Sequence, residues 1–181
     1  DANEKIQSVC KNFKIQKHRA VLFLDPFGMQ VSWDTFKSVA GTQCIDMWLL
    51  FPVSAVARML PNDGNIREEW QKKLDDFFGD RSWKEEFYKT SKTRTLFDDK
   101  PVTFSEKIAN TAIIQESITK RLKDIFPEVL DKPLLLNNSK NSPLFSRLCK
   151  SHFLNSNHGC RGEAQEAQAR VLSHTQRFGW I

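Results

Sequence analysis

Glycine is scarce in this sequence, and its spacing excludes one common cofactor motif. The chain has 181 residues and seven glycines, and no two of these glycines are separated by a single residue. A nucleoside cofactor needs a glycine-rich turn after a first strand, so that the backbone can approach the ligand, and an acid later in the chain to hold the ribose. The sequence therefore lacks the usual turn for such a cofactor.

Long apolar runs and a targeting segment are also missing. No stretch reaches the roughly 18 consecutive apolar residues that span a bilayer, and the first residues, DANEKIQ, do not have the pattern of a signal peptide. The four cysteines are irregularly spaced, which is not typical of a disulfide framework in a chain long enough for a large core. We therefore expect a soluble, cytoplasmic protein with reduced thiols and no membrane contact.

The composition is that of a folded chain with a moderate excess of positive charge. Apolar residues make up 40% of the chain and include 14 Phe and 5 Trp, which is enough to offset the ordering entropy by burial. The net charge of +5 favours acidic partners such as nucleic acid, although the cations are scattered and form no basic arm. We expect one domain over residues 1–149 and a polar tail over residues 150–181.

Two apolar runs predict a strand, a helix and a second strand in the first third of the chain. Ala20–Leu24 is apolar throughout, which is typical of a strand covered on both faces by helices. Ile45–Phe51 is the second run and closes at Pro52. Between the runs, Ser32 can cap a helix that Gly41 would stop. This order predicts parallel strands with a right-handed crossover.

Amphipathic periodicity and capping residues predict the helices. Apolar stripes indicate helices within residues 6–13, 53–60 and 66–78, the last ended by Gly79. The S/T-x-x-E pattern of a capping box occurs at Ser82–Glu85 and at Thr103–Glu106. The second box predicts the longest helix, from about Phe104 to Phe126.

The remaining segments predict a loop and a hairpin. Lys89–Lys100 is polar, and we expect it to be a mobile loop. Pro133–Leu136 and Pro143–Cys149 are short apolar runs on either side of turn-favouring residues, so we expect an antiparallel pair. The predicted fold is therefore α/β: parallel strands followed by a terminal antiparallel hairpin, with flanking helices.

The first strand ends in the unusual stretch Asp25-Pro26-Phe27-Gly28. Ligands bind beyond the carboxyl ends of the strands in open parallel sheets. At that edge a carboxylate can accept hydrogen bonds from an amine, the proline fixes the turn, and an aromatic ring can stack on a planar base. These groups suit an exocyclic amino group, with Asp25 or water as proton acceptor. A structural role is the alternative, since Asp-Pro is common where a strand ends and Phe27 can fill the core.

A wider set of residues carries a resemblance to a known family. The stretch from Phe23 to Leu60 resembles the three-Cys-motif partner (TcmP) family, whose members are similar to Rossmann-type methyltransferases that use S-adenosylmethionine. The matching residues are Asp25, Pro26, Phe27, Gly28, Trp33, Asp46, Trp48, Phe51, Pro52 and Arg58. A weaker similarity continues through Asn138-Ser139 and Ser142-Pro143-Leu144.

The resemblance implies a site and a cofactor. Asp25 to Phe27 are similar to the D/N-P-P-Y/F motif of amino-methyltransferases, with Phe27 in place of the second proline and Gly28 in place of the aromatic residue. Asp25, Pro26 and Phe27 would then be catalytic, and Gly28, Trp33 and Arg58 would bind substrate. S-adenosylmethionine is the implied cofactor, although its glycine-rich turn is absent from this sequence.

Two functions of different classes follow from this resemblance. The first is an enzyme that methylates an amino group of a nucleic-acid base, with the cofactor held by residues outside this chain. The second is a non-catalytic scaffold for a three-Cys-motif protein, in defence against phage. We expect only the carboxyl-terminal half of a methyltransferase-type sheet, and an open edge on its first strand covered by a second chain, a swapped copy or the long helix.

Two further groups of residues have a structural and a functional interpretation. Cys149, His152, His158 and Cys160 are zinc-ligand types within twelve residues, but their spacing is unusual for zinc, so we predict no metal. Asp46 lies within an apolar strand and can shape the site or pair with Arg58 or a backbone amide, because a buried charge needs a partner. Arg58 can contact a phosphate or form an ion pair.

Overall fold

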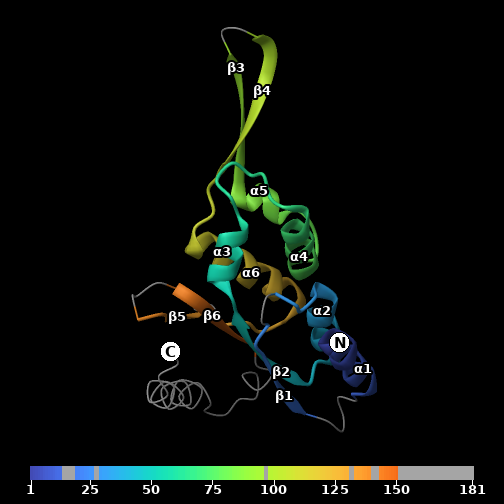
Figure 1. Cartoon of the computed structure of the whole chain (residues 1–181). Helices are drawn as coiled ribbons and strands as arrows, with labels where there is room; N and C mark the ends of the chain where they lie inside the picture. The colour runs from blue at the N-terminus through green and yellow to red at the C-terminus, as the bar shows by residue number, and fades with distance from the viewer. Residues whose placement is uncertain (14–18, 27–28, 96–97, 131–132, 140–142, 151–181) are drawn as a thin grey trace.

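The computed structural model describes residues 1–13, 19–26, 29–95, 98–130, 133–139 and 143–150. Over these residues the chain forms a mixed α/β fold (Figure 1). Most of the described helices gather on one side of a four-stranded sheet, and a separate two-stranded arm projects from the far end of the helical layer. The predicted polar tail lies outside the described residues, except for Lys150.

The described part of the chain forms six helices and six strands. In chain order they are α1 (Ala2–Asn12), β1 (Ala20–Leu24), α2 (Trp33–Thr42), β2 (Ile45–Phe51), α3 (Val53–Met59), α4 (Glu68–Phe78), α5 (Trp83–Phe87), β3 (Tyr88–Thr95), β4 (Asp98–Lys107), α6 (Thr111–Ile125), β5 (Leu134–Asn137) and β6 (Pro143–Lys150).

The main sheet is mixed, with the strand order β1-β2-β6-β5. β1 and β2 are parallel, and Leu24 lies opposite Leu49. β6 is antiparallel to both of its neighbours, β2 and β5. The parallel pair and the antiparallel hairpin are therefore confirmed, as is the α/β class in the form of a mixed sheet with flanking helices.

The covering of β1 differs from the prediction. Val21 and Phe23 are 55% and 74% exposed, whereas Leu24 is buried. The Phe23 ring stacks on Trp48 of β2, with 6.0 Å between the ring centroids. The prediction that helices cover both faces of β1 is therefore wrong. A run of five apolar residues has no alternation to reveal which face is open, so the sequence could not show it.

The core lies between the sheet and the helices and is rich in aromatic rings. Phe77 of α4 is fully buried and contacts three other rings at centroid distances of 5.6 to 5.7 Å. These rings belong to α2, to β2 and to α4 itself, so one side chain joins three elements. The connected aromatic residues are Trp33, Phe36, Phe51, Phe77, Phe78, Trp83 and Phe87.

The two predicted glycine stops have different outcomes. Gly79 ends α4 with φ of 88°, a left-handed conformation, as predicted. Gly41 does not end α2, which continues to Thr42. Gln43 takes the left-handed conformation instead, with φ of 54°, and donates its backbone N–H to the Ala40 carbonyl oxygen.

The segment from Tyr88 to Lys107 is a β-hairpin and not a loop followed by a helix. Tyr88 pairs with Lys107 and Ser91 with Phe104, so the capping-box residues Thr103–Glu106 lie in a strand. α6 begins at Thr111, where the Asn110 side chain accepts a hydrogen bond from the Ile113 backbone N–H at 3.0 Å. The predictions of a mobile loop at Lys89–Lys100 and of a helix starting at Phe104 are therefore wrong.

No helix within the described ranges is both long enough and apolar enough to span a bilayer.

Candidate functional site

The carboxyl edge of the parallel pair β1–β2 is the place where the sequence predicts a site. Asp25 follows the last residue of β1, outside any helix, and its side chain is exposed. Pro26 is buried. The structure therefore places the acid at the end of a parallel strand, where ligands bind in open α/β sheets.

The chain turns sharply after Asp25. The Met29 backbone N–H donates to the Pro26 carbonyl oxygen at 3.2 Å, and Met29 has φ of 60° although it is not glycine. Met29 is 3% exposed, so burial of its side chain holds this uncommon conformation. Phe27 and Gly28 lie outside the described residues, so the predicted stacking ring and the predicted role of Gly28 are untested.

The segment after the turn lines a hollow of about 450 Å³. This volume lies in the range of pockets that hold small organic ligands. Its wall comes from the start of α1, from the β1–α2 connection and from α4, and its residues are Asp1, Asn3, Met29, Gln30, Val31, Ser32, Lys73 and Asp76. Asp25 is not in this wall and lies four residues before Met29 along the chain.

The polar groups of the hollow fall into two classes. Asn3 is engaged in fixing the wall, because its amide nitrogen donates to the Gln30 carbonyl oxygen at 2.7 Å and its oxygen accepts from the Ser32 backbone N–H at 3.0 Å. The side chains of Gln30, Lys73 and Asp76 are exposed and supply an amide, a cation and a carboxylate. An amide and a carboxylate can hydrogen-bond the edge of a planar base, and a cation can bind a phosphate.

Trp33, predicted to bind substrate, lies in the core at the start of α2. It is 9% exposed, and its ring meets Phe36 edge to face at a centroid distance of 5.6 Å. Gly79 approaches the Trp33 ring so closely that a Cβ there would lie 2.3 Å from Trp33 Cδ1. The structure does not bring Trp33 to the hollow.

Arg58 and Asp46 belong to different elements: Arg58 is on α3, which follows the carboxyl end of β2, and Asp46 is near the start of β2. Arg58 is exposed in the last turn of α3, which follows the carboxyl end of β2. Asp46 is 7% exposed near the opposite end of β2, where it faces Val21 across the ladder. The predicted acid at this position is therefore not at the carboxyl edge with Asp25.

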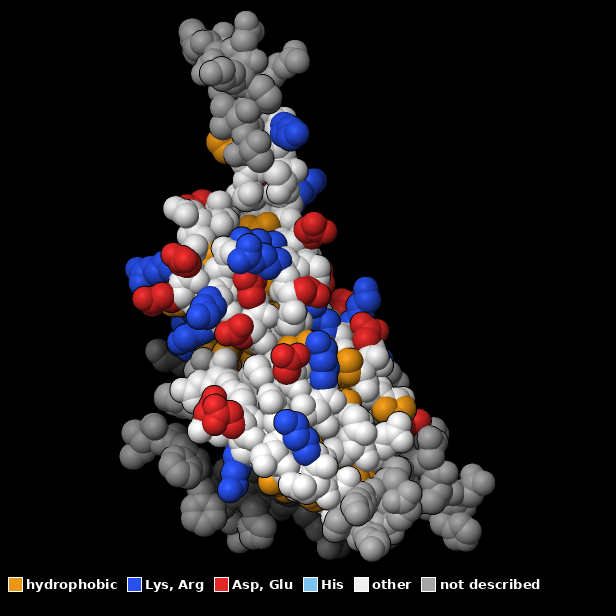
Figure 2. All heavy atoms as spheres, turned by 90° about the vertical axis from the view of Figure 1, so that its right-hand side faces the viewer, with side chains coloured by type: hydrophobic (Ala, Val, Ile, Leu, Met, Phe, Trp, Pro, Cys, Tyr) orange, Lys and Arg blue, Asp and Glu red, His pale blue; other side chains and the backbone are white. Residues whose placement is uncertain are grey.

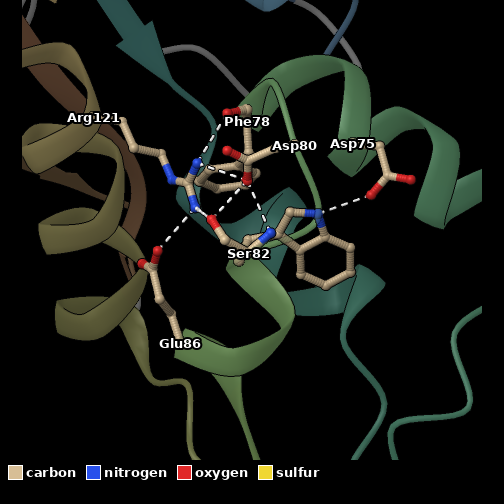
Figure 3. A network of polar contacts seen from close by, with 7 residues as sticks. Asp75, Phe78, Asp80, Ser82, Glu86 and Arg121 are labelled. Carbon is tan, nitrogen blue, oxygen red and sulfur yellow. Dashed lines mark hydrogen bonds and ion pairs between the residues drawn. The ribbon is translucent and has the colours of Figure 1, made fainter. Parts of the chain in front are cut away.

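A charged cluster that the sequence did not predict is centred on Arg121 of α6 (Figure 3). Its guanidinium donates to the Phe78 carbonyl oxygen at 3.1 Å and to the Ser82 hydroxyl at 2.7 Å. It also pairs with Asp80 at 3.1 Å and Glu86 at 2.8 Å. With these groups it ties α6 to the α4–α5 corner, so the cluster has a structural role.

Asp80 in this cluster has a perturbed acidity. The Ser82 hydroxyl, 2.6 Å away, is the largest influence and lowers the pKa of Asp80; the Ser82 backbone N–H and Arg121 lower it further. Ser82 carries the first capping-box prediction, and α5 does begin after it, but its hydroxyl binds Asp80 and makes no cap to the helix. The sequence could not reveal this network, because Arg121 is 39 residues from Ser82.

The described residues contain no group of three or more metal-ligating side chains. The zinc-ligand types of the tail are not tested, because His152, His158 and Cys160 lie outside the described residues and the side chain of Cys149 is not described. Cys10 and Cys44 are buried free thiols. Burial, and then the neighbouring Cys44, raise the pKa of Cys10, so its thiol is a poor metal ligand.

The described glycines do not fit a nucleoside cofactor. Gly41 lies inside α2, Gly64 packs against Ser105, and Gly79 packs against Trp33. None of these three follows a parallel strand, which is the position from which a glycine lets the backbone approach a ligand. In the comparisons with known proteins, no family model, no curated protein and no solved structure matches this chain.

Proposed function

We propose that this chain is a methyltransferase-like module of the three-Cys-motif partner type that binds amine-bearing nucleic-acid bases. The site is the carboxyl edge of β1 together with the hollow beyond it. The observation that carries the proposal is the exposed Asp25 carboxylate at the end of a parallel strand, where the chain turns and enters the wall of a hollow of about 450 Å³.

The arrangement of the strands supports this proposal. The sequence resemblance implies the carboxyl-terminal half of a methyltransferase-type sheet, with parallel strands followed by an antiparallel hairpin. β1 and β2 are parallel, and the hairpin of β5 and β6 adds to β2 through β6. Such a sheet places its binding edge at the carboxyl ends of β1 and β2, where Asp25 lies.

The chemistry of the edge suits a base with an exocyclic amine. The Asp25 carboxylate accepts hydrogen bonds and donates none when ionised, so it favours an amine over a carbonyl. Gln30 adds a donor and an acceptor, and Lys73 can bind the phosphate of a nucleotide. Binding, and not transfer, is the function that these residues support.

Methyl transfer would require S-adenosylmethionine, the cofactor that the resemblance implies. The described residues do not fit it, because none of the described glycines follows a parallel strand. We therefore derive no step of methyl transfer. Calorimetric titration of the chain with S-adenosylmethionine tests directly whether the chain holds this cofactor. Tight binding by the chain alone would restore the hypothesis that the protein is a methyltransferase.

Base preference and an Asp25 variant test the proposal. We expect the chain to bind single-stranded oligo(dC) or oligo(dA) more tightly than oligo(dT), because thymine lacks an exocyclic amine. Asp25→Asn should remove most of that preference, since a hydrogen bond to a charged group contributes about 1.5–3 kcal/mol, or roughly 10- to 100-fold in affinity. Fluorescence anisotropy of labelled oligonucleotides measures both effects.

The matched control for this experiment is Asp34→Asn. Asp34 lies on α2, its side chain is 79% exposed, and it is not among the residues that line the hollow, so the variant makes the same charge change outside the proposed site. It should leave the base preference unchanged. Equal binding of all three oligonucleotides, or the same loss in both variants, would count against the proposed site.

A scaffold for a three-Cys-motif protein is a second candidate, and one observation favours it. Val21 and Phe23 place two large apolar side chains in solvent on the outer face of β1. Exposed apolar groups on a sheet are typical of contact surfaces. Co-purification with a three-Cys-motif protein tests this candidate, and Phe23→Lys should abolish the complex whereas Val9→Lys on α1 should not.

A further inference from the structure

We propose that the hollow beside Met29 takes the 3′-terminal nucleotide of a single-stranded RNA, and that Asp76 and Lys73 of α4 recognise its sugar and its phosphate. This inference rests on the proposed function, because it names the strand end that the same site holds. The ligand chemistry is a ribose with a free 2′,3′-diol beside one phosphate. The hollow, about 450 Å³ in volume, suits one nucleotide, since pockets for small organic ligands range from about 300 to 1,000 Å³.

The wall formed by residues 29–32 is fixed without a ligand. The Asn3 amide nitrogen donates to the Gln30 carbonyl oxygen at 2.7 Å. The Asn3 oxygen accepts from the Ser32 backbone N–H at 3.0 Å and from the Thr35 hydroxyl at 2.8 Å. Thr35 is fully buried, so this clamp belongs to the folded body. A preformed wall lowers the cost of ordering the site when a ligand binds.

α4 supplies two opposite charges to the hollow. Lys73 and Asp76 are both exposed, both line the hollow, and lie one helical turn apart, where Cβ atoms are about 5–6 Å from each other. At the same spacing on α2, Asp34 and Lys37 form an ion pair at 3.3 Å. The ion pairs of the described residues include none between Lys73 and Asp76. Both charges are therefore available to a ligand.

A simpler explanation is that Lys73 and Asp76 are solvated surface charges. The order of the two signs agrees with it, because a cation that precedes an acid pairs less well on a helix than the reverse. Their common position favours recognition instead. Both side chains border one preformed hollow, whereas the neighbouring Lys72 is exposed and does not line it. A cation and a carboxylate one turn apart suit a ligand that has an anion and hydroxyl donors close together.

A ribose end group matches these two charges. The Asp76 carboxylate accepts hydrogen bonds and can take one from each hydroxyl of the diol, and acids commonly hold ribose hydroxyls in this way. DNA lacks the 2′-hydroxyl, so this contact distinguishes RNA from DNA. The Lys73 ammonium is a point charge that binds the phosphate joining this nucleotide to the strand.

The charge of the hollow favours a strand end over a nucleotide within a strand. Its ionisable side chains are one cation, Lys73, and two carboxylates, Asp1 and Asp76. Lys73 can offset one phosphate, and a second phosphate would meet like charge. A nucleotide within a strand has a phosphate on each side, whereas a 3′-terminal nucleotide with a free diol has one. Figure 2 shows Lys or Arg and Asp or Glu side chains interspersed over the described surface on the side of α1, α2 and α4, which does not favour a long strand.

The test is binding of 5′-labelled oligo(rC) with three different 3′ ends, measured by fluorescence anisotropy on the full chain. We expect the free diol to bind most tightly. A 3′-phosphate should weaken binding about tenfold or more, and a terminal 2′-deoxynucleotide about fivefold or more, because hydrogen bonds to a charged group are lost. Asp76→Asn should reduce both differences to within about twofold. Equal binding of the three ends by the unchanged chain would overturn the proposal.

Matched variants separate the site from net charge. Asp124→Asn, at an exposed residue of α6 outside the hollow, should retain the preference for the free diol. Lys73→Gln should weaken all three ends about fivefold or more and lower the slope of log K against log salt by about 0.7, whereas Lys72→Gln should change neither. Equal losses in the two lysine variants would overturn the proposal. All four residues are exposed, so we expect melting temperatures close to that of the unchanged chain.

Two further measurements separate this inference from the proposed function and from a free nucleotide. Oligo(rC) against oligo(rU) measures base preference, which Asp25→Asn should remove while the preference for the free diol persists. Base preference without end preference would leave the proposed function and overturn this inference. Cytidine 5′-monophosphate carries the same diol and one phosphate, and the RNA should bind at least about tenfold more tightly, because its further bases reach the edge of β1. Equal affinities would assign the hollow to a free nucleotide and overturn the RNA end.

Discussion

At the scale of single residues, Gly79 is a position where backbone conformation and packing both require glycine. Its φ is 88°, and a Cβ there would lie 2.3 Å from Trp33 Cδ1. Gly41, in contrast, lies within α2 with no atom within 4 Å of a Cβ. The two glycines have the same side chain, but the structure assigns them opposite roles.

We therefore expect opposite effects of alanine at these two glycines. Gly79→Ala should destabilise the fold by roughly 2–4 kcal/mol, because it adds left-handed strain to a clash with a core ring. Gly41→Ala should stabilise it by about 0.5–1 kcal/mol, because glycine is unfavourable inside a helix. Urea denaturation measures both free energies of unfolding. Similar values for the two variants would show that Trp33 does not confine Gly79.

Single residues also differ in how far the sequence alone predicts their roles. Asp25 lies at the end of a strand as predicted, because an apolar run followed by Asp-Pro is a local signal that needs no tertiary information. Trp33 has a role that no local pattern could show. An aromatic residue at the start of an amphipathic helix has the same sequence signature whether it faces a ligand or the core, and the approach of Gly79, 46 positions later, makes it a core residue.

At the scale of elements, the arm shows how a non-local pairing overrides a local signal. Thr103–Glu106 has the form of a capping box, and each such cap contributes only about 1 kcal/mol. The ladder from Tyr88 to Lys107 uses the same residues in a strand, and the bonds that Lys107 makes to α3 fix that strand at its base. Asn110 then caps α6 four residues later than the capping box ends.

The base of the arm provides a pH-dependent prediction, since Tyr88 is the only tyrosine in the chain. Burial, and then the negative charge of Asp63, raise the pKa of Tyr88 from 10.0 to about 12. The neutral phenol is thus favoured in the folded state. The stability it contributes is fully present below pH 10 and is lost as the pH rises from about 10 to about 12.

The ultraviolet absorbance of tyrosinate measures this directly, because Tyr88 is the sole contributor. We expect a titration midpoint near 12 for the folded chain and near 10 in denaturant. Tyr88→Phe should abolish the signal and flatten the alkaline limb of the stability profile. A midpoint near 10 in the folded chain would mean that the phenol at the base of the arm is exposed.

At the scale of the whole molecule, β1 is the notable feature, because it pairs with β2 alone among the described strands. An end strand presents backbone donors and acceptors to other chains. α6 packs against α3, α5 and β6, so the prediction that the long helix covers β1 has no support in the described contacts. A second chain or a swapped copy remains as the predicted cover.

We expect the chain to self-associate through β1, because the exposed rings and methyl groups of Phe23 and Val21 accompany the open strand edge. Sedimentation should show species heavier than the monomer that increase with concentration. Phe23→Lys should shift the protein to the monomer, since a charged residue on an edge strand opposes pairing. Val9→Lys, at a residue that is 42% exposed on α1, is the control and should not change the distribution.

The sequence by itself determined the elements whose signals are local. β1, β2 and the hairpin of β5 and β6 were predicted from apolar runs and turn residues, and α4 from its stripe and its glycine stop. Each of these signals arises from residues within a few positions of one another, where backbone preferences and periodic burial act directly.

Only the tertiary structure decided which faces and groups these elements present. It left one face of β1 open, placed Trp33 in the core, formed the hollow beside Met29, and gathered the partners of Arg121 from more than 30 positions away. It also made an arm of a segment with a helix-capping pattern. These outcomes depend on contacts between residues distant in sequence. The energies of these contacts exceed local preferences of about 1 kcal/mol, and a short window of sequence does not contain both partners of a contact.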